Sequence, residues 1–506
     1  MALKATLTRP YSDALARLRG MQDAHDVADL LEVPVGQLLY ILYRVPDNKR
    51  YRTFEVRKRS GGTRVIDAPM GGTAILLRKL LPLLVGYYKV KPSAHGFIAN
   101  RSIRTNASVH VRRRHVLNVD LADFYGHINF GRVRGLFMAE PFCMGDKAAS
   151  VVAHLCCCRK RLPQGSPTSP VLSNLIAADL DRRLGAIARH YHLKYTRFAD
   201  DITFSTNEEH FPAAIAQSVG ERTEGEAPAV VGVALSKAIR DAGFVVNTEK
   251  VVLRGRRARQ TVTGLTVNSF PNVRRRFVRR VRAMLHAWEA FGLEAAAREY
   301  FDRYANGRSP ADGDSAAGLR FREVIWGSLA YIKQIRGGDD LVYTRLALWA
   351  ARIDPSPPAF TTLLKEEHQV FDVFISHASE DKETVARPVY EACRALGVAA
   401  FLDEKYIKWG DSLTEKINHA LGRSRLVLAV MSEYSLGKTW PALEVNAALA
   451  REIAGRQKVL PLVVQPVDLS SVPLIFHKLY VEWEGDASSI AERLQDVLRD
   501  DKRGDA

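Results

Sequence analysis

The sequence predicts a multidomain protein in which an α+β part comes first and a flavodoxin-like α/β domain follows. The chain has 506 residues, which is longer than one hydrophobic core usually organises. A proline-rich break, DPSPPAF, covers residues 354–360, where proline stiffens the chain and ends any helix. The charge divides near the same place: residues 1–370 carry a net +21, whereas residues 371–506 hold 17 Lys and Arg against 21 Asp and Glu.

Downstream of the break, short apolar runs alternate with amphipathic stretches. The runs are FDVFISHA (371–378), VAAFLD (398–403), RLVLAVMS (425–432) and KVLPLVV (458–464). The stretches between them include ETVARPVYEACRALG, SLTEKINHALG and WPALEVNAALAREIAG. Near-continuous apolar strands separated by helices are typical of a parallel sheet that is covered on both faces. We therefore expect a compact flavodoxin-like domain over residues 370–506.

Upstream of the break, helices and strands are mixed. The stretch DVADLLEVPVGQLLYILY has helical periodicity, and YRTFEVRKRSGGTRVIDAP predicts two strands joined by a glycine turn with basic residues at its tip. VLNVDLADFY (116–125) begins as a strand, and PTSPVLSNLIAADLDRRLGAIARH opens on two prolines before a long helix. Residues 273–352 are predicted to be mostly helical.

Positive charge is concentrated in three runs of the first part. They are VRRRH (111–115), RGRRAR (254–259) and RRRFVRRVR (274–282). One such run alone is usually a solvated face, but three runs with a net +21 predict a nucleic-acid partner. No apolar run is long enough to span a bilayer, and the N-terminal residues lack the apolar stretch of a signal peptide, so we expect a cytoplasmic protein without a membrane partner.

Two adjacent carboxylates stand between aromatic and β-branched flanks in YTRFADDITFS (195–205). The flanks predict a β-hairpin with Asp200 and Asp201 at its turn, and most such pairs are ordinary solvated turns. Asp120, however, ends the apolar strand in NVDLADF, and an adjacent antiparallel strand would bring it beside the hairpin tip. Three converging carboxylates would hold two Mg²⁺ ions about 3.5 to 4 Å apart, as two-metal phosphoryl transfer requires.

This ordered set of segments resembles the reverse transcriptases. Asp120 matches the first catalytic acid of that family, and FADD (198–201) matches its YxDD-type box with phenylalanine in place of the usual tyrosine. LPQGSPTSPVLSNL (162–175) resembles the box that lines the nucleotide pocket, and AGFVVNTEK (242–250) resembles a later palm box. The resemblance implies a right-hand polymerase with fingers, palm and thumb, in which Asp120, Asp200 and Asp201 are the catalytic metal ligands. Of these we expect Asp200 to be a direct ligand and Asp201 a supporting one.

The resemblance also implies contacts to an incoming dNTP. Tyr125 falls where the family keeps an aromatic steric gate against the ribose 2′-hydroxyl, and Lys250 is a candidate proton donor to the departing pyrophosphate. RKRSGGTRVIDAP resembles the fingers hairpin, where Arg64 is the first choice for the triphosphate and Arg57 and Lys58 are further candidates. The expected dNTP-binding residues are Arg64, Tyr125, Gln164, Gly165 and Lys250. Taken singly, Gln164 could be a helix cap, Tyr125 a core residue and Lys250 a surface lysine.

Two further elements resemble those of retron reverse transcriptases. NASVH (106–110) matches the NAxxH element and VTG (262–264) matches the VTG element, while SAHGF (93–97) and GSLAYIKQIRG (327–337) fit the same group. The resemblance implies a structured noncoding RNA as partner, with DNA synthesis that starts from a guanosine 2′-hydroxyl within it. The arginine-rich run at 274–282 would form a thumb surface whose apolar stripe packs inward. The expected RNA-binding residues are Asn106, His110, Val262, Thr263, Gly264, Arg275 and Arg279.

The C-terminal domain resembles a TIR domain. FDVFISHASEDK (371–382) is similar to its first box, AAFLDEKYIKWGDSL to its BB-loop region, and Glu444 lies four residues after Trp440, the spacing of the catalytic acid in enzymatic TIR domains. The resemblance implies NAD⁺ as substrate, with Glu444 as catalytic residue stabilising oxocarbenium-like charge. The expected NAD-binding residues are Phe374, Ser376, Trp409 and Trp440. Pro441 stands where many relatives have cysteine, and Glu444 on an exposed helix face of a purely assembling domain is the alternative.

Together the resemblances imply a retron reverse transcriptase fused to a TIR effector. The expected domains are fingers and palm (1–270), a helical thumb (271–353), a proline-containing linker (354–369) and the TIR domain (370–506). The enzyme would make RNA-linked single-stranded DNA, and its TIR domain would hydrolyse NAD in antiphage abortive infection, with homo-oligomers forming on activation. The alternatives are a defence reverse transcriptase whose TIR domain is a non-catalytic scaffold, and a defence polymerase without a retron RNA.

Overall fold

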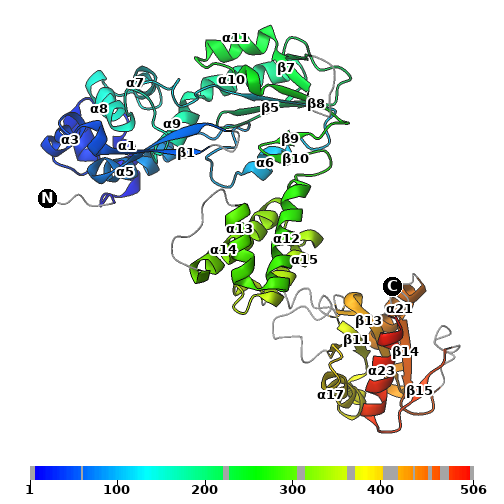
Figure 1. Ribbon diagram of the computed structural model, residues 1–506. Coiled ribbons are helices and arrows are strands. Elements are labelled where there is room, and N and C mark those ends of the chain that lie inside the picture. The colour runs from blue at the N-terminus through cyan, green and yellow to red at the C-terminus, as the bar shows by residue number, and fades with distance from the viewer. Residues whose placement is uncertain are drawn as a thin grey trace. The chain divides into compact units, whose positions relative to one another are not determined.

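The computed structural model describes residues 6–57, 61–219, 227–304, 314–361, 371–402, 417, 420–436, 439–453, 458–467 and 478–501. The chain divides into two compact units, Met1–Leu346 and Ala347–Ala506 (Figure 1). The finer division into fingers, palm, thumb and linker stays a prediction. Within the described ranges, no helix combines the length and apolar character that crossing a bilayer would need.

The first unit opens with a helical cluster and a two-stranded hairpin. The helices of this region are α1 (Tyr11–Arg17), α2 (Ala24–Leu30), α3 (Val35–Tyr43), α4 (Asp47–Arg50), α5 (Gly71–Tyr87), α6 (Ile103–Ser108), α7 (Phe130–Met138), α8 (Asp146–Cys156) and α9 (Ser169–Ile176). Strands β1 (Tyr51–Arg57) and β2 (Thr63–Pro69) pair antiparallel, which confirms the predicted strand, turn and strand. β1 is exposed along most of its length and β2 is exposed at residues 63–65, so the tip of the hairpin extends from the helical cluster (Figure 1).

An antiparallel sheet forms the centre of the first unit. Its strands follow the order β4-β5-β3-β8-β7-β6. Their bounds are β3 (His115–Asp120), β4 (Lys194–Phe198), β5 (Asp201–Thr206), β6 (Ala216–Ser218), β7 (Ala227–Val231) and β8 (Val252–Gly255). Helices α10 (Ala178–His190) and α11 (Val233–Asp241) pack together over one face (Figure 1). Buried residues of the sheet and of these helices share one core with the N-terminal helices, so the first unit is of the mixed α+β class that we expected.

The end of the first unit is helical. A small hairpin, β9 (Thr261–Val262) and β10 (Leu265–Thr266), follows the short turn η1 (Thr248–Lys250) and strand β8. The helices after it are α12 (Arg275–Phe291), α13 (Leu293–Arg303), α14 (Asp314–Arg336) and α15 (Leu341–Ile353), and the boundary between the two units falls within α15. On α12 the side chains of Val281, Met284, Leu285 and Trp288 are buried, while the arginines at 275, 276, 279, 280 and 282 are exposed. This confirms the predicted inward-packing apolar stripe.

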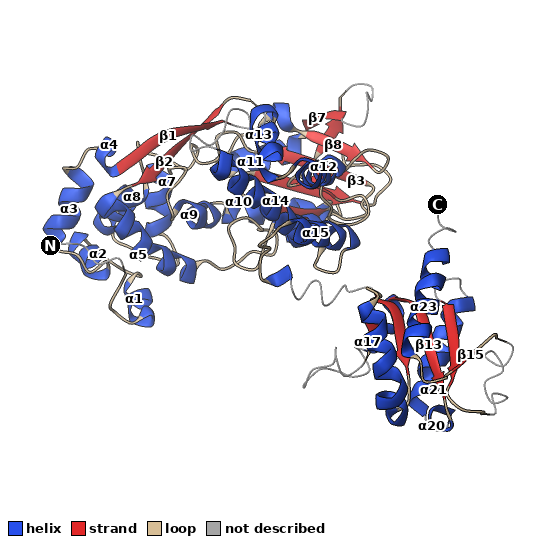
Figure 2. Cartoon of the chain, turned by 60° about the horizontal axis from the view of Figure 1, so that its bottom comes forward, coloured by secondary structure: helices blue, strands red, loops and turns tan. Residues whose placement is uncertain are grey.

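The second unit is a parallel sheet with helices on both faces (Figure 2). Its strands β11 (Phe371–Ser376), β12 (Ala400–Phe401), β13 (Ser424–Met431), β14 (Lys458–Val463) and β15 (Val481–Glu482) pair in the order β12-β11-β13-β14-β15. Its helical segments are η2 (Ser379–Asp381), η3 (Lys382–Ala386), α17 (Arg387–Ala395), α20 (Glu433–Leu436), α21 (Thr439–Ile453) and α23 (Ala487–Asp501). Val373 packs in a core with α17 and α23, whereas Phe374 packs in a second core with α21. The strand order is that of flavodoxin-like folds, and the predicted class is confirmed.

Candidate functional site

The acidic pair of the first unit lies at a tight turn between β4 and β5. The two strands pair antiparallel, with Phe198 opposite Asp201, and Ala199 has a positive φ of 57°. Strand β3 pairs with β5 so that Asp120 lies opposite Asp201, and the backbone N–H of Leu121 donates to the carbonyl of Asp200 at 3.1 Å. The predicted hairpin, and the predicted approach of Asp120 to its tip, are therefore confirmed.

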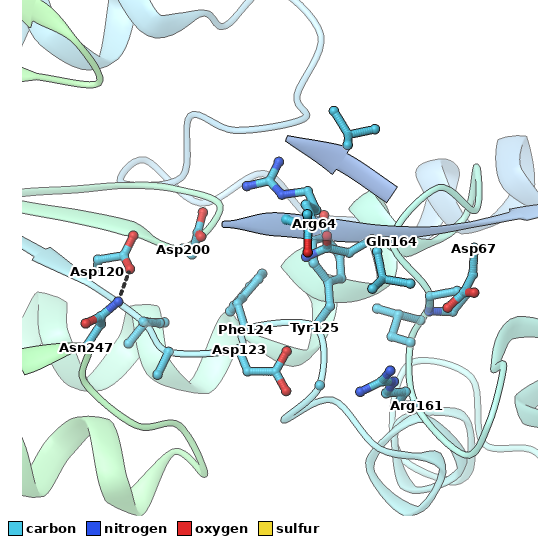
Figure 3. Close-up of a pocket in the computed structure, with 18 of the residues that line it drawn as sticks. Arg64, Asp67, Asp120, Asp123, Phe124, Tyr125, Arg161, Gln164, Asp200 and Asn247 are labelled. Atoms are coloured by element: carbon cyan, nitrogen blue, oxygen red, sulfur yellow. Dashed lines mark hydrogen bonds between the residues drawn. The ribbon is translucent and has the colours of Figure 1, made fainter. Parts of the chain in front are cut away.

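A cavity of about 700 Å³ opens beside this turn (Figure 3). Residues from the β1–β2 hairpin, the end of β3, the segment before α9, the β4–β5 turn and the segment around η1 line it. The polar residues of the lining are Arg57, Thr63, Arg64, Asp67, Asp120, Asp123, Tyr125, Arg161, Gln164, Asp200, Asn247 and Lys250. In Figure 3, Asp120 and Asp200 lie near each other, while Asp67 and Arg161 lie farther along the cavity.

The carboxylates at this end of the cavity are only partly compensated by positive charge. Asp120 accepts hydrogen bonds from Asn247 Nδ2 at 3.1 Å and from Lys250 Nζ at 3.0 Å. Burial, followed by the neighbouring Asp120 charge, raises the pKa of Asp200. Asp201 is exposed at the strand end, yet desolvation by surrounding protein and the charges of Asp200 and Asp120 raise its pKa to about 7. Burial contributes most to both shifts and repulsion between the carboxylates adds to it, and a bound cation would favour the charged form of each acid.

The carboxylates at this end of the cavity are suitable ligands for a divalent cation, although they do not form a complete metal site by themselves. Among the described residues, no group of three His, Cys, Asp or Glu side chains is close enough to hold a metal ion. Asp120 and Asp200 line the cavity, whereas Asp201 lies outside its lining but opposite Asp120 in the β3–β5 pairing, so the three-carboxylate metal set stays a prediction. Carboxylate oxygens in an open polar cavity suit Mg²⁺, which keeps several waters and takes one or two protein carboxylates with substrate phosphates.

Most of the predicted dNTP contacts line the same cavity. Arg64, Tyr125, Gln164 and Lys250 all do so, as does Arg57, while Lys58 lies outside the described residues. Burial raises the pKa of Tyr125 to about 12, so its hydroxyl stays protonated at neutral pH.

Gly165 follows the lining residue Gln164 and is exposed, and its expected contact to the nucleotide stays a prediction. It has a φ of +116°, and an added Cβ would meet Ile66 Cγ2 at 2.8 Å. Next to it, the carbonyl of Gln164 accepts the Asp67 N–H at 2.7 Å. Glycine at this position allows this segment to pack closely against β2.

Sequence reasoning missed a buried ion pair beneath the acidic turn. Arg197 is fully buried and donates from Nε and Nη2 to the two oxygens of Asp181, both at 2.8 Å. Its Nη1 donates to the carbonyl of Ala199 at 3.1 Å, and Tyr195 Oη donates to Asp181 Oδ1 at 2.7 Å. An arginine next to Phe198 near the end of a predicted strand was the available signal, but the sequence could not show that its partner is Asp181, on α10.

The two retron-like elements, more than 150 residues apart in sequence, pack together in space. Helix α6 contains Asn106 and contacts β4, β9 and β10. Thr263 and Gly264 form the β9–β10 turn with φ values of 46° and 83°, and Thr263 Oγ1 donates to the carbonyl of Ile103 at 3.4 Å. Positive φ at both central residues is the hairpin geometry in which glycine is favoured. The two elements therefore form one structural feature beside the central sheet.

Several predicted RNA contacts are corrected by burial. Asn106, His110 and Val262 are fully buried, so their side chains cannot touch an RNA while the fold is intact. His110 bonds through its two ring nitrogens to Ser205 Oγ and Thr196 Oγ1, each at 2.7 Å, and burial lowers its pKa to about 3. A neutral imidazole there joins α6 to strands β4 and β5. Gly264, Arg275 and Arg279 are exposed and Thr263 is half-buried, so these four remain candidates.

In the second unit, Glu444 is enclosed rather than displayed on an exposed helix face. It has 9% of its surface exposed and accepts a hydrogen bond from Ser376 Oγ at 2.8 Å. Ser376 ends β11, next to β13, which is where the strand order of a flavodoxin-like sheet reverses and ligand crevices form. The predicted acid and Ser376 are therefore brought together.

The other predicted NAD contacts, Phe374, Trp409 and Trp440, are not seen beside Glu444 as Ser376 is. Phe374 is buried and stacks on Phe401 at 5.2 Å between ring centroids, so its expected role as a lining residue is corrected to a core residue. Trp409 lies outside the described residues, as does the side chain of Trp440. A second buried pair, Ser432 Oγ to Asp381 Oδ2 at 2.6 Å, follows the end of β13 and was not anticipated.

The geometry of the two units defines a class of protein: a palm-type polymerase unit joined to a flavodoxin-like unit with an enclosed acid. Family models agree, since residues 56–265 match "Reverse transcriptase (RNA-dependent DNA polymerase)" and residues 373–498 match "TIR domain". Retron Ec86 reverse transcriptase from Escherichia coli is 30% identical over 269 residues, which cover 53% of this chain and 78% of that protein. The chain belongs to the retron reverse transcriptase family and carries a C-terminal TIR domain.

Two further relatives match one unit each. Retron Mx65 reverse transcriptase from Myxococcus xanthus is 40% identical over 281 residues, which cover 52% of this chain and 62% of that protein. The 2′ cyclic ADP-D-ribose synthase AbTIR from Acinetobacter baumannii is 38% identical over 109 residues, or 22% of this chain and 40% of that protein. The chain thus spans about three fifths of the Mx65 enzyme and two fifths of AbTIR.

Proposed function

We propose that the first unit is an RNA-directed DNA polymerase that makes RNA-linked single-stranded DNA from a cognate structured RNA. The observation that supports this most is the single cavity in which Asp120 and Asp200 face Arg64, Tyr125, Gln164 and Lys250. These groups come from five separated segments of the chain, and each suits one part of a nucleotide. Membership of the retron family supports the RNA-linked product and the noncoding RNA partner.

Each group of residues in the cavity would have a different role in nucleotide transfer. Arg64 and Arg57 present guanidinium groups to a triphosphate, and Tyr125 lies where it can restrict the sugar. Lys250 lies 3.0 Å from Asp120 and is the candidate donor of a proton to the departing pyrophosphate. Asp120 and Asp200 would hold Mg²⁺, with Asp201 as the supporting acid. When bound, two Mg²⁺ ions would help to activate the attacking hydroxyl and to stabilise the leaving group.

The test replaces each cavity acid by its isosteric amide. Asp120→Asn and Asp200→Asn should each lower DNA synthesis on an RNA template by at least about a thousandfold, because neither amide offers the anionic oxygen that a divalent cation prefers. The matched control is Asp123→Asn, which alters an acid that lines the same cavity but lies outside the proposed metal set. Full activity in either of the first two variants would overturn the polymerase proposal.

We propose further that the RNA partner is a retron noncoding RNA. The protein would be purified from its native host, and the nucleic acid bound to it would be sequenced. A branched molecule, in which DNA is joined to an RNA guanosine 2′-hydroxyl, supports the proposal. Recovery of unbranched DNA alone would show a defence polymerase without a retron RNA.

We propose that the TIR unit cleaves the nicotinamide glycosidic bond of NAD⁺ in a cytoplasmic antiphage response. Glu444, enclosed beside Ser376 at the reversal point of the sheet, is the observation that supports this. A carboxylate facing the nicotinamide ribose would stabilise positive charge as that bond breaks. The names of the TIR relatives make cyclic ADP-ribose a product to be measured beside linear ADP-ribose.

The decisive variant is Glu444→Gln, which keeps the size of the side chain and removes its charge. NAD cleavage by the activated protein should fall at least about a hundredfold while DNA synthesis is unchanged. Protection against phage should be lost in the same variant. If protection persists without NAD cleavage, the TIR unit acts as a scaffold and the NADase proposal is wrong.

A further inference from the structure

Two of the three basic runs in the sequence meet in space at the end of β3 remote from the catalytic acids. Strand β3 pairs with β8 so that His115 lies opposite Gly255 and Val116 lies opposite Arg254. This joins the run at residues 111–115 to the run at 254–259, although about 140 residues separate them. His115 begins β3 and Asp120 ends it, so at about 3.3 Å per residue the two positions are roughly 17 Å apart.

A second cavity, of about 710 Å³, lies at this junction. Its lining is Arg114, His115, Glu209, His210, Ser218, Leu253, Arg254, Gly255, Arg256, Arg257 and Ala258, and it shares no residue with the catalytic cavity. Four arginines and two histidines face one acid. That acid, Glu209, is exposed and approaches Arg114 at 3.8 Å. The cavity therefore keeps a strong positive charge that suits a polyanion.

The junction is braced from inside by a fully buried amide. Gln260 Nε2 lies within hydrogen-bond distance of the carbonyls of Arg113 at 2.9 Å, Arg114 at 3.2 Å and Arg254 at 3.3 Å, which share its two N–H groups, so one side chain ties the two basic runs together. Asn268 extends this support, since its Oδ1 accepts from the backbone N–H of Gln260 at 2.9 Å. The basic surface is therefore held in a fixed shape.

A tight turn presents two arginines at the rim of this cavity. The backbone N–H of Ala258 donates to the carbonyl of Gly255 at 3.0 Å, which places Arg256 and Arg257 at the two central positions of the turn. Asn268 Nδ2 donates to the carbonyls of Arg256 and Ala258, and so fixes the turn from below. Both arginines are exposed, and no carboxylate in the described part of the chain pairs with either.

We propose that this surface, defined by Arg114, Arg256 and Arg257, binds the phosphate backbone of a base-paired nucleic acid at a site separate from the catalytic cavity. Guanidinium groups held on a rigid turn match phosphate geometry. None of the described lining residues is Phe, Tyr or Trp, and the His115 ring is already bonded to the carbonyl of Glu209 at 3.1 Å and lies edge-on to Phe211, so the lining favours contacts to a phosphate backbone over stacking of unpaired bases. The inference rests on the proposed polymerase function, and it gives the folded part of the RNA, or its duplex with DNA, a binding surface remote from the chemistry.

The test compares the full-length double variant Arg256→Ala/Arg257→Ala with the parent protein. The probes are a 20-base-pair RNA hairpin, a DNA hairpin of the same sequence and a single-stranded RNA, each titrated at several salt concentrations. The matched control is Arg189→Ala/Arg240→Ala, which removes the same charge from exposed positions on α10 and α11.

The double variant should bind at least one hairpin about tenfold more weakly, with a salt dependence less steep by roughly 0.9 for each lost phosphate contact. The probe with the larger loss identifies whether the duplex is RNA or DNA. Incorporation of one dNTP at a saturating primer-template should be unchanged, because the catalytic cavity is intact.

The proposal would be overturned if the double variant bound both hairpins with unchanged affinity. It would also be overturned if the double variant lost as much affinity for the single-stranded RNA as for the hairpins, or if the control variant lost as much hairpin affinity as the double variant. If the parent protein makes DNA and the double variant binds both hairpins normally, only this inference fails. If the Asp120 and Asp200 variants keep full activity, the polymerase proposal fails instead.

Discussion

The palm acids and the TIR acid are held in place by different means. Asp200 has its position set by the backbone of a turn, and the turn is fixed by the buried Arg197–Asp181 pair beneath it. Glu444 is instead held through its own carboxylate, which accepts a hydrogen bond from the Ser376 hydroxyl. Asp200 therefore lines an open cavity, as metal binding would need, beside Asp120, whose Oδ1 accepts from Asn247 and Lys250, while the TIR acid is enclosed and directed. A change near the palm acids should act through folding or charge, and a change near Glu444 should act through orientation.

The largest expected effect is on the rate of nucleotide incorporation by Lys250 variants. Beside Asp120, Lys250 could act as a proton donor or only as a positive charge, and two substitutions distinguish these roles. Lys250→Met removes both its charge and its proton, whereas Lys250→Arg keeps the charge but cannot release a proton near neutral pH. Both variants should lower the rate of single-nucleotide incorporation by about a hundredfold to ten-thousandfold if Lys250 is the proton donor. Pre-steady-state kinetics would measure this rate. Near-normal incorporation by Lys250→Arg would show that only the charge is needed.

The next effect tests whether the palm turn depends on the buried pair. Arg197→Met leaves Asp181 buried without its partner, and the free energy of unfolding should fall by about 3 to 5 kcal/mol. Urea denaturation of the full chain would measure it. The control is Arg182→Met on α10, which breaks an exposed pair with Asp179 and should cost about 1 kcal/mol or less. Equal losses in the two variants would show that burial of Arg197 adds nothing special to the turn.

A smaller effect is expected from the hydroxyl that holds Glu444. Ser376→Ala removes a hydrogen bond to a carboxylate, worth about 1.5 to 3 kcal/mol, so NAD cleavage should fall by roughly tenfold to a hundredfold. DNA synthesis should not change. Ser432→Ala is the matched control, because Ser432 makes a similar buried bond to Asp381 after the neighbouring strand. An NAD cleavage rate that falls equally in both variants would indicate a general loss of folding.

Much of this organisation could be predicted because strand pairing follows local patterns. The flanks of FADD and the apolar strand before Asp120 were enough to predict that these acids meet, and the register of β3 against β5 bears this out. The flavodoxin-like unit could be predicted equally well, because β11, β12, β13 and β14 lie in nearly continuous apolar runs, whereas the short strand β15, Val481–Glu482, gave no such signal.

Features that depend on distant partners could not be predicted from local pattern. The His110 ring bonds to two partners, Ser205 on β5 and Thr196 on β4. Nothing in the sequence near residue 110 shows that the ring is buried between them. Phe374 was expected in a crevice because it lies near the end of β11, but it stands two residues before Ser376 on the same face and packs in the core beneath α21. The joining of the two basic runs through Gln260 likewise depends on sheet register, which the charge pattern does not contain.

The smallest expected effect follows from the raised pKa of Asp201. Its folded-state value of about 7 lies above its unfolded value near 4, so the folded protein holds this proton more tightly than the unfolded chain does. Stability should therefore fall as the pH rises from about 4 to about 7 and then level off. Thermal unfolding at pH 5.5, 6.5 and 8 would measure a shift of modest size, because Asp201 is exposed to water.

Two comparisons make this pH prediction specific to the palm acids. Asp201→Asn should flatten the dependence, whereas Asp302→Asn, which changes an exposed acid on α13, should leave it intact. Added Mg²⁺ should raise the unfolding temperature more at pH 8 than at pH 5.5, because protons compete with the cation for the same carboxylates. An equal effect of Mg²⁺ at both pH values, or no effect of Asp201→Asn, would contradict the view that the palm acids share an excess of negative charge. Glu444→Gln should leave the Mg²⁺ response unchanged, since the enclosed TIR acid is not part of that cluster.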